Sequence, residues 1–127
     1  MGVEGRPTVV VVDDEQPIVD IVCEVLDDAG LAAVSCVHGH EAFGCIRSTQ
    51  PHVVILDVQM LGVDGIQIFR TMRSDPKTSS IPVIFFTANA SKLKTWLPEY
   101  AQMGAQLLPK PFDLEKLLTM VNQSLAG

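Results

Sequence analysis

TVVVVDDEQ, residues Thr8 to Gln16, joins four consecutive valines to two aspartates and a glutamate. Valine is stiff at χ1 and suits a pleated surface, so this run predicts a strand that is buried on both faces. Such strands are typical of parallel sheets that lie between two layers of helices. The carboxylates that end so apolar a strand therefore indicate a function.

Strand patterns and helix patterns alternate along the rest of the chain. Pro98 would break or restart a helix, so 99–103 is the predicted helical part of the stretch 89–104. Alternation of this kind predicts parallel βαβ units with right-handed crossovers, in a sheet with helices on both faces. The expected strands lie at 9–12, 31–36, 53–57, 81–87 and 107–108, and the first two expected helices at 17–30 and 39–49. Two further helices are expected, one capped by Asp64 with apolar residues up to Met72 and one capped by Asp113 with apolar residues up to Leu125.

Composition limits the class of protein. The chain has 127 residues, of which 47% are hydrophobic and 19% charged, which suits one packed domain. A net charge of -6 argues against direct binding to nucleic acid, because that needs clustered Lys and Arg. Three cysteines without C-x-x-C spacing do not indicate disulfides, and no apolar run approaches the ~20 residues that span a bilayer. These features predict a soluble cytoplasmic protein without membrane contact.

Polar residues end four of the predicted strands. They are Asp13 and Asp14, then Asp57, Thr87 and Lys110. In an open parallel sheet ligands bind beyond the carboxyl ends of the strands, so these side chains should converge. Three carboxylates raise one another's pKa unless cations intervene. Because the donors are hard oxygens, the sequence predicts Mg²⁺, with Mn²⁺ as the other candidate.

Several short motifs occur in order at these strand ends. They are VVVVDDE, VVILDVQM followed by GVDG, IPVIFFTA and KPF. Each motif alone is weak, but together they resemble the receiver domain of two-component response regulators over Thr8 to Leu125. The resemblance implies a flavodoxin-like α/β fold, with five parallel strands in the order 2-1-3-4-5. It also implies that residues 1–127 form a single receiver domain with a core of about 8–125.

The same resemblance implies the metal ligands. Asp14 and Asp57 would bind Mg²⁺ directly, the backbone carbonyl of Gln59 would be the third protein ligand, and Asp13 would act through water. Glu15, by contrast, is expected to begin the first helix. On their own, Asp13 and Asp14 could equally cap that helix, because a helix N-terminus favours negative charge.

The resemblance makes Asp57 the phosphoacceptor of a phosphorelay. Its partner would be a histidine kinase or a phosphotransfer protein that carries a phosphohistidine. Lys110 would offset charge on the phosphoryl oxygens, and Thr87 would hydrogen-bond the attached group. The small Ala88 leaves room for that group, and the Lys110-Pro111 bond is cis in the family.

The expected output is a switched protein-interaction surface. Its downstream partner is unknown, and a phosphorylation-dependent homodimer is one form it could take. If the chain is complete, output is a protein contact or a phosphate relay. Two other classes stay open: a phosphohydrolase with an aspartyl-phosphate intermediate, which typically has an acid where this chain has Gln59, and a pseudo-receiver that binds partners without phosphorylation.

Three residues depart from the family pattern. Leu107 replaces the usual aromatic residue, Leu61 replaces the usual proline, and Pro98 interrupts the fourth helix. From Leu107 and Pro98 we hypothesise that the segment 89–104 is mobile and signals by becoming ordered.

Two further groups have weaker functional interpretations. Cys36, His38 and His40 lie close together but lack a fourth metal ligand, and His52 is expected to be a strand-end residue. The second group, Lys92, Lys94 and Trp96, could form a docking surface, although solvated lysines beside a partly buried Trp are the simpler interpretation.

Overall fold

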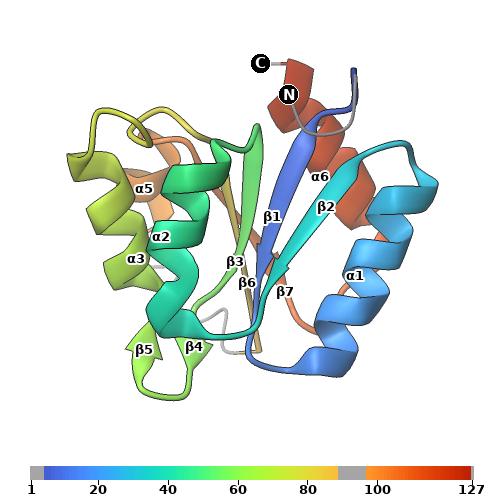
Figure 1. Ribbon diagram of the computed structural model, residues 1–127, viewed down its shortest axis with the longest axis horizontal. Helices are drawn as coiled ribbons and strands as arrows, with labels where there is room; N and C mark the ends of the chain where they lie inside the picture. Colours follow the sequence, from blue (N-terminus) through green and yellow to red (C-terminus); the bar gives the residue numbers. More distant parts are fainter. Residues whose placement is uncertain (1–4, 89–96, 127) are drawn as a thin grey trace.

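A computed structural model describes residues 5–88 and 97–126 of the chain (Figure 1). Lys92, Lys94 and Trp96 lie outside the described residues, as does the first half of the segment 89–104. The elements are β1 (Thr8–Val12), α1 (Gln16–Asp28), β2 (Ala32–Cys36), α2 (Gly39–Thr49), β3 (Val53–Asp57), β4 (Gln59–Met60), β5 (Val63–Asp64), α3 (Gly65–Ser74), β6 (Val83–Thr87), α5 (Leu97–Ala101), β7 (Ala105–Pro109) and α6 (Leu114–Ala126).

The main sheet confirms the predicted topology. Within the described residues, five parallel strands pair in the order β2-β1-β3-β6-β7. Strands β6 and β7 are the fourth and fifth strands expected from the sequence, because the labels β4 and β5 belong to a separate hairpin. Pro109 ends the edge strand β7, where a residue without an N–H is tolerated.

Strand β1 is buried on both faces, as the valine run predicts. Val9, Val10, Val11 and Val12 are all 0% exposed. Alternate valines point to opposite faces, so two hydrophobic clusters form, one on each side of the sheet. In Figure 1, α2 and α3 cover one face, whereas α1 and α6 cover the other.

The helix starts follow the expected capping residues. Asp64 accepts a hydrogen bond from the Ile66 N–H at the start of α3, and Asp113 accepts one from the Glu115 N–H at the start of α6. Helix α5 begins at Leu97, beside Pro98, and ends at Ala101, so the predicted bounds of 99 and 103 were wrong. Across the described helices, none is long and apolar enough to cross a membrane.

The β4–β5 hairpin was not predicted from the sequence. Gln59 pairs with Asp64 and Met60 pairs with Val63, in antiparallel register. A Cβ on Gly65, the next residue, would collide with the main-chain oxygen of Asp57, so only glycine lets α3 start this close to β3. In Figure 1 the hairpin projects beyond the carboxyl ends of the strands.

Candidate functional site

Three aspartates meet at the carboxyl edge of the sheet, as predicted. Asp13 and Asp14 follow β1 and Asp57 ends β3, and one carboxylate oxygen of each lies within 4.8 Å of the others. Their burial differs, because Asp13 and Asp57 are 0% and 3% exposed whereas Asp14 is an exposed residue. The cluster is therefore a buried pair of carboxylates with a third at its mouth.

Lys110 brings the positive charge to this cluster. Its Nζ donates a hydrogen bond of 2.9 Å to Asp13 Oδ2 and lies 3.6 Å from Asp57 Oδ2. Burial alone would lower the pKa of Lys110, but the hydrogen bond to Asp13 and the charges of Asp57, Asp13 and Glu15 outweigh it and raise the pKa. The ammonium therefore stays charged. The Lys110–Pro111 bond is cis, as the resemblance implies.

Asp57 is the carboxyl group most perturbed by this arrangement. Burial raises its pKa, and the nearby Asp13 carboxylate raises it further, whereas Lys110 and the Gln59 N–H, 3.4 Å from Asp57 Oδ1, lower it. The balance raises the pKa of Asp57 from 3.8 to about 7. Without a metal, the acid is therefore partly protonated near neutral pH.

The other two acids of the opening stretch have local partners. Asp13 Oδ1 accepts a hydrogen bond of 3.0 Å from the Glu15 N–H, and neither Asp13 nor Asp14 is the N-cap residue of α1. That residue is Glu15, as expected, although its side chain makes no capping hydrogen bond. Its carboxylate lies 3.6 Å from Lys110 Nζ instead, so Glu15 adds to the negative charge around the ammonium.

The residues present fit a divalent cation. Three aspartates cluster, and the Lys110 ammonium lies close to two of them, Asp13 and Asp57. The acidic donors are hard oxygens, which Mg²⁺ and Mn²⁺ prefer. Gln59 begins β4, two residues beyond Asp57, and its main-chain N–H lies against Asp57 Oδ1. Among the described residues, these three aspartates are the group with metal-binding spacing, and Cys36 instead donates through Sγ to the His38 carbonyl.

Thr87 occupies the expected strand end. It is the last residue of β6, is 1% exposed, and its carbonyl accepts a hydrogen bond of 2.8 Å from the Lys110 N–H. The register pairs Asp57 of β3 with Phe86 of β6, and Thr87 of β6 with Pro109 of β7, so the ends of these three strands lie at one level. Ala88 follows Thr87 and is exposed.

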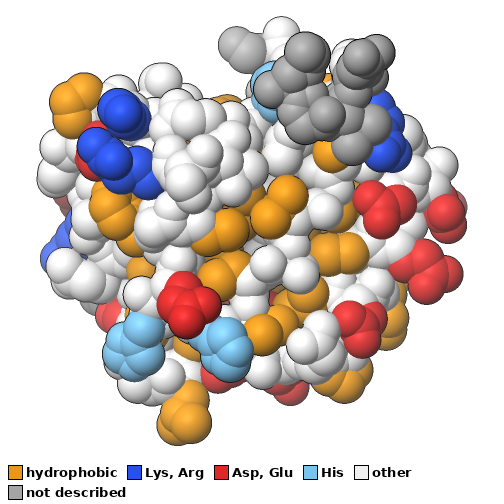
Figure 2. Space-filling model, viewed as in Figure 1, with side chains coloured by type: hydrophobic (Ala, Val, Ile, Leu, Met, Phe, Trp, Pro, Cys, Tyr) orange, Lys and Arg blue, Asp and Glu red, His pale blue; other side chains and the backbone are white. Residues whose placement is uncertain are grey.

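An apolar groove of about 500 Å³ lies beside the charged cluster. Lys110 lines one side of it, and exposed Ile21 lies in its wall rather than in the buried stripe of α1. The other lining residues are Ile18, Val22, Ala88, Pro111, Phe112 and Leu114. Figure 2 shows acidic side chains gathered over α1, where Asp20, Glu24, Asp27 and Asp28 are exposed.

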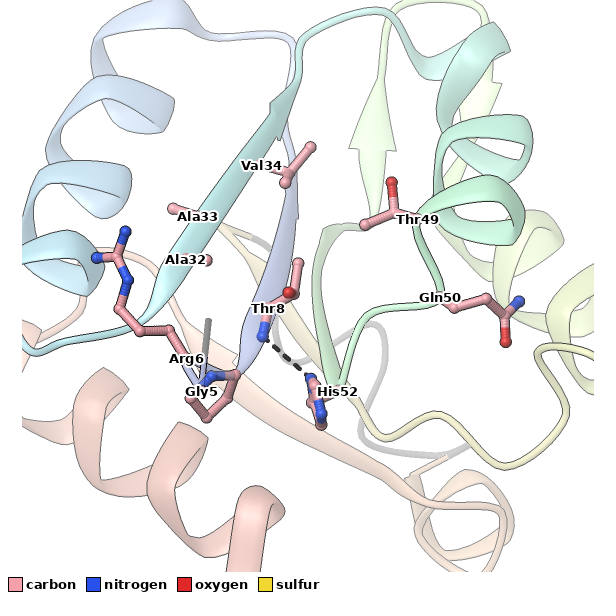
Figure 3. A pocket seen from close by; sticks show the side chains of 10 residues that line it. Gly5, Arg6, Thr8, Ala32, Ala33, Val34, Thr49, Gln50 and His52 are labelled. Carbon is pink, nitrogen blue, oxygen red and sulfur yellow. Dashed lines mark hydrogen bonds between the residues drawn. The ribbon is translucent and has the colours of Figure 1, made fainter. Parts of the chain in front are cut away.

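A second hollow, of about 540 Å³, lies at the opposite end of the sheet (Figure 3). Thr8 and Ala32, which line it, begin β1 and β2, so the strands separate it from the acidic cluster. His52 Nδ1 accepts a hydrogen bond of 3.0 Å from the Thr8 N–H. His52 is therefore a strand-end residue, as the sequence predicts.

Comparisons with known proteins agree with this geometry. The family model for the response regulator receiver domain matches residues 9–122. Over 121 residues the chain is 31% identical to the DNA-binding transcriptional regulator NtrC of Salmonella typhimurium, an alignment that covers 95% of this chain and 25% of NtrC. It is 30% identical to the DNA-binding dual master transcriptional regulator RpaA of Synechocystis, over 91% of this chain and 47% of RpaA. The chain thus spans between a quarter and about half of these curated relatives.

Solved structures show the same fold. The receiver domain of the Francisella response regulator 1452 aligns with a TM-score of 0.84 at 26% identity, covering 95% of this chain and 98% of that chain. The chemotaxis protein CheY4 of Vibrio cholerae aligns with a TM-score of 0.83 at 29% identity, covering 94% and 99% of the two chains.

Proposed function

Because this chain belongs to the response regulator receiver domain family, we propose that Asp57 is its phosphoacceptor. The observation that carries the proposal is the placement of Asp57, a nearly buried carboxylate at the end of β3 with Lys110 Nζ at 3.6 Å. The phosphodonor would be a phosphohistidine on a histidine kinase or a phosphotransfer protein. We further propose that residues 1–127 act as one receiver domain with a core of about 8–125.

Phosphoryl transfer needs an ionised nucleophile and a fixed positive charge. One oxygen of Asp57 attacks the phosphorus, the P–N bond breaks, and the imidazole nitrogen of the donor keeps the electron pair. Lys110 offsets charge on the phosphoryl oxygens, and Thr87 donates its hydroxyl hydrogen to the attached group. Mg²⁺ or Mn²⁺, held by Asp14, Asp57 and the Gln59 carbonyl and through water by Asp13, would supply further charge neutralisation.

The surroundings of Asp57 support a protein as the phosphodonor. The apolar groove runs from Lys110 to Ile21, and the exposed face of α1 beside it is acidic. When a phosphohistidine reaches Asp57, the surface of the protein that carries it must lie against both the groove and the acidic face of α1. We propose that this surface is apolar where it meets the groove and basic where it meets α1, because complementary charge orients partners and speeds association.

The proposed output is a change in a protein-interaction surface. Phosphorylation would shift an equilibrium between two conformations, and a homodimer is one assembly that could read the change. The relatives named as DNA-binding are about two to four times as long as their match to this chain, so direct contact with nucleic acid is not part of the proposal. Because phosphohistidine is made from ATP, we place the reaction in the cytoplasm.

Intact-mass measurement tests the phosphoacceptor. The chain is incubated with a small phosphodonor such as acetyl phosphate and Mg²⁺, beside Asp57→Asn and the exposed control Asp28→Asn. We expect a labile gain of one phosphate in the wild type and in Asp28→Asn, but none in Asp57→Asn. No adduct in the wild type would favour a pseudo-receiver, whereas sustained turnover of an organic phosphate would favour a phosphohydrolase.

A further inference from the structure

Leu61 connects the β4–β5 hairpin to the acidic cluster. Its backbone N–H donates a hydrogen bond of 2.8 Å to Asp14 Oδ2, although the two residues are 47 positions apart. Among the described residues this is the one hydrogen bond that the Asp14 carboxylate accepts. The Leu61 side chain is 91% exposed, so its apolar atoms contribute little to the fold. Leu61 therefore contributes to the described structure mainly through its backbone N–H, which binds Asp14.

The hairpin holds this donor in a defined place. Met60 pairs with Val63, so Leu61 and Gly62 form a two-residue turn. Gly62 has a φ of +75° and Leu61 has a negative φ, the pattern of a type II turn. The strand after the turn ends at Asp64, which caps α3, and the Gly65 N–H donates to the Val58 carbonyl at 2.8 Å. Both ends of the hairpin are thus fixed next to Asp57.

We propose that the Leu61 N–H is a positioning group for the metal site. It holds one oxygen of Asp14 and leaves the other free to bind the cation. Asp14 is exposed, so without this bond its carboxylate would sample several rotamers and would lose that freedom when a cation binds. The inference rests on the proposed Mg²⁺ site and adds a donor that lies outside the set of ligands.

The order of the β4–β5 hairpin and the binding of the cation must affect each other equally. If the ordered hairpin favours cation binding at Asp14, then cation binding favours the ordered hairpin by the same factor. Leu61 lies in the turn of the β4–β5 hairpin. A bound cation would therefore reduce the motion of this turn, which carries the exposed Leu61 side chain.

Two substitutions at position 61 separate the N–H from the side chain. Leu61→Ala keeps the N–H and removes only exposed atoms. Leu61→Pro removes the N–H, yet proline suits the first central position of a type II turn, so the hairpin is retained. The difference between the two variants therefore measures the hydrogen bond to Asp14.

The test is isothermal titration calorimetry of Mg²⁺ into the full chain. We expect Leu61→Pro to bind Mg²⁺ about 5-fold more weakly than wild type, the size expected when one side chain must be immobilised on binding. We expect Leu61→Ala to stay within about 2-fold of wild type, and both variants to match wild type in metal-free melting temperature. Equal Mg²⁺ affinity for the two variants would overturn the inference.

A second measurement does not depend on how Leu61→Pro folds. Amide hydrogen exchange at Leu61 in the wild type should slow when Mg²⁺ is added, and unchanged exchange would count against the inference. Failure of the wild type to bind Mg²⁺ would instead refute the proposed metal site and the inference together. Mg²⁺ binding by the wild type tests the metal site, and the difference in Mg²⁺ affinity between Leu61→Ala and Leu61→Pro tests the role of the Leu61 N–H.

Discussion

Replacing Asp57 with Asn should stabilise the metal-free protein at alkaline pH. Burial and the Asp13 carboxylate raise the pKa of Asp57 from its ordinary 3.8 to about 7. Each pKa unit corresponds to about 1.4 kcal/mol, so ionising Asp57 in the folded state costs at most about 4 kcal/mol. Asparagine removes that cost but leaves a buried amide that needs partners, so we expect a net gain of about 2 kcal/mol at pH 8.

The sign and the pH window follow from linkage. Between pH 4 and pH 7 the folded protein holds a proton on Asp57 that the unfolded chain has already released. The unfolding free energy of the wild type, relative to Asp57→Asn, therefore falls as the pH rises through this window and levels off above about pH 7. The advantage of Asp57→Asn should grow from pH 5 to pH 8.

Urea denaturation in buffer with a chelator measures this difference. Wild type and Asp57→Asn are compared at pH 5 and pH 8, with Asp28→Asn as a control for the loss of an exposed carboxylate. Excess Mg²⁺ at pH 8 should stabilise the wild type more than Asp57→Asn, because a ligand stabilises the state that binds it. If Asp57→Asn is no more stable than wild type at pH 8, or its advantage does not change with pH, then ionised Asp57 does not destabilise the folded state.

Three other substitutions probe the site and its support. Lys110→Met should slow phosphorylation of Asp57 by small donors by about 10²-fold, the usual effect of removing a charge-stabilising donor, and mass spectrometry over time would show it. Arg73→Lys should lower the unfolding free energy by about 2 kcal/mol in urea denaturation, because the Arg73 guanidinium donates to three backbone carbonyls and lysine cannot reach all three. Gly65→Ala should lower the melting temperature, because its Cβ meets the Asp57 main-chain oxygen, whereas Gly44→Ala, which has open space in α2, should not; equal effects would contradict the structure.

The fold and the buried part of the site were predictable from local patterns. A run of valines encodes a covered strand, and the position of Asp57 after such a strand places it at the carboxyl edge without knowledge of any contact. The position of Lys110 required further information to predict, because it depends on β7 lying at the edge of the sheet beside β6. The resemblance to the receiver domain family implied that placement, and Pro109 is consistent with it, since proline is tolerated at an edge.

The exposed part of the site was not predictable in the same way. Leu61 meets Asp14 through its backbone, and a backbone N–H carries no signal in the identity of its residue. Gly62 indicated a turn between Met60 and Val63. However, the strands on each side of this turn have two residues each, which is too short for a periodic pattern. Ile21 shows a related limit of sequence patterns. It satisfies the apolar period of α1 but lies in the wall of a groove, which periodicity alone cannot distinguish from the core.

The charges that would serve the proposed phosphorylation of Asp57 also make the metal-free fold less stable. Asp13 is fully buried and already paired with Lys110, so Asp57 is left as the carboxylate whose charge is poorly compensated. A cation or a phosphoryl group at Asp57 changes that balance, and the change reaches the main chain directly, because Gly65 packs on the Asp57 carbonyl and begins α3. Any movement of Asp57 that accompanies its modification must therefore displace α3 or the β4–β5 hairpin, since close-packed contacts transmit small shifts. We expect the conformational response to begin in these two elements.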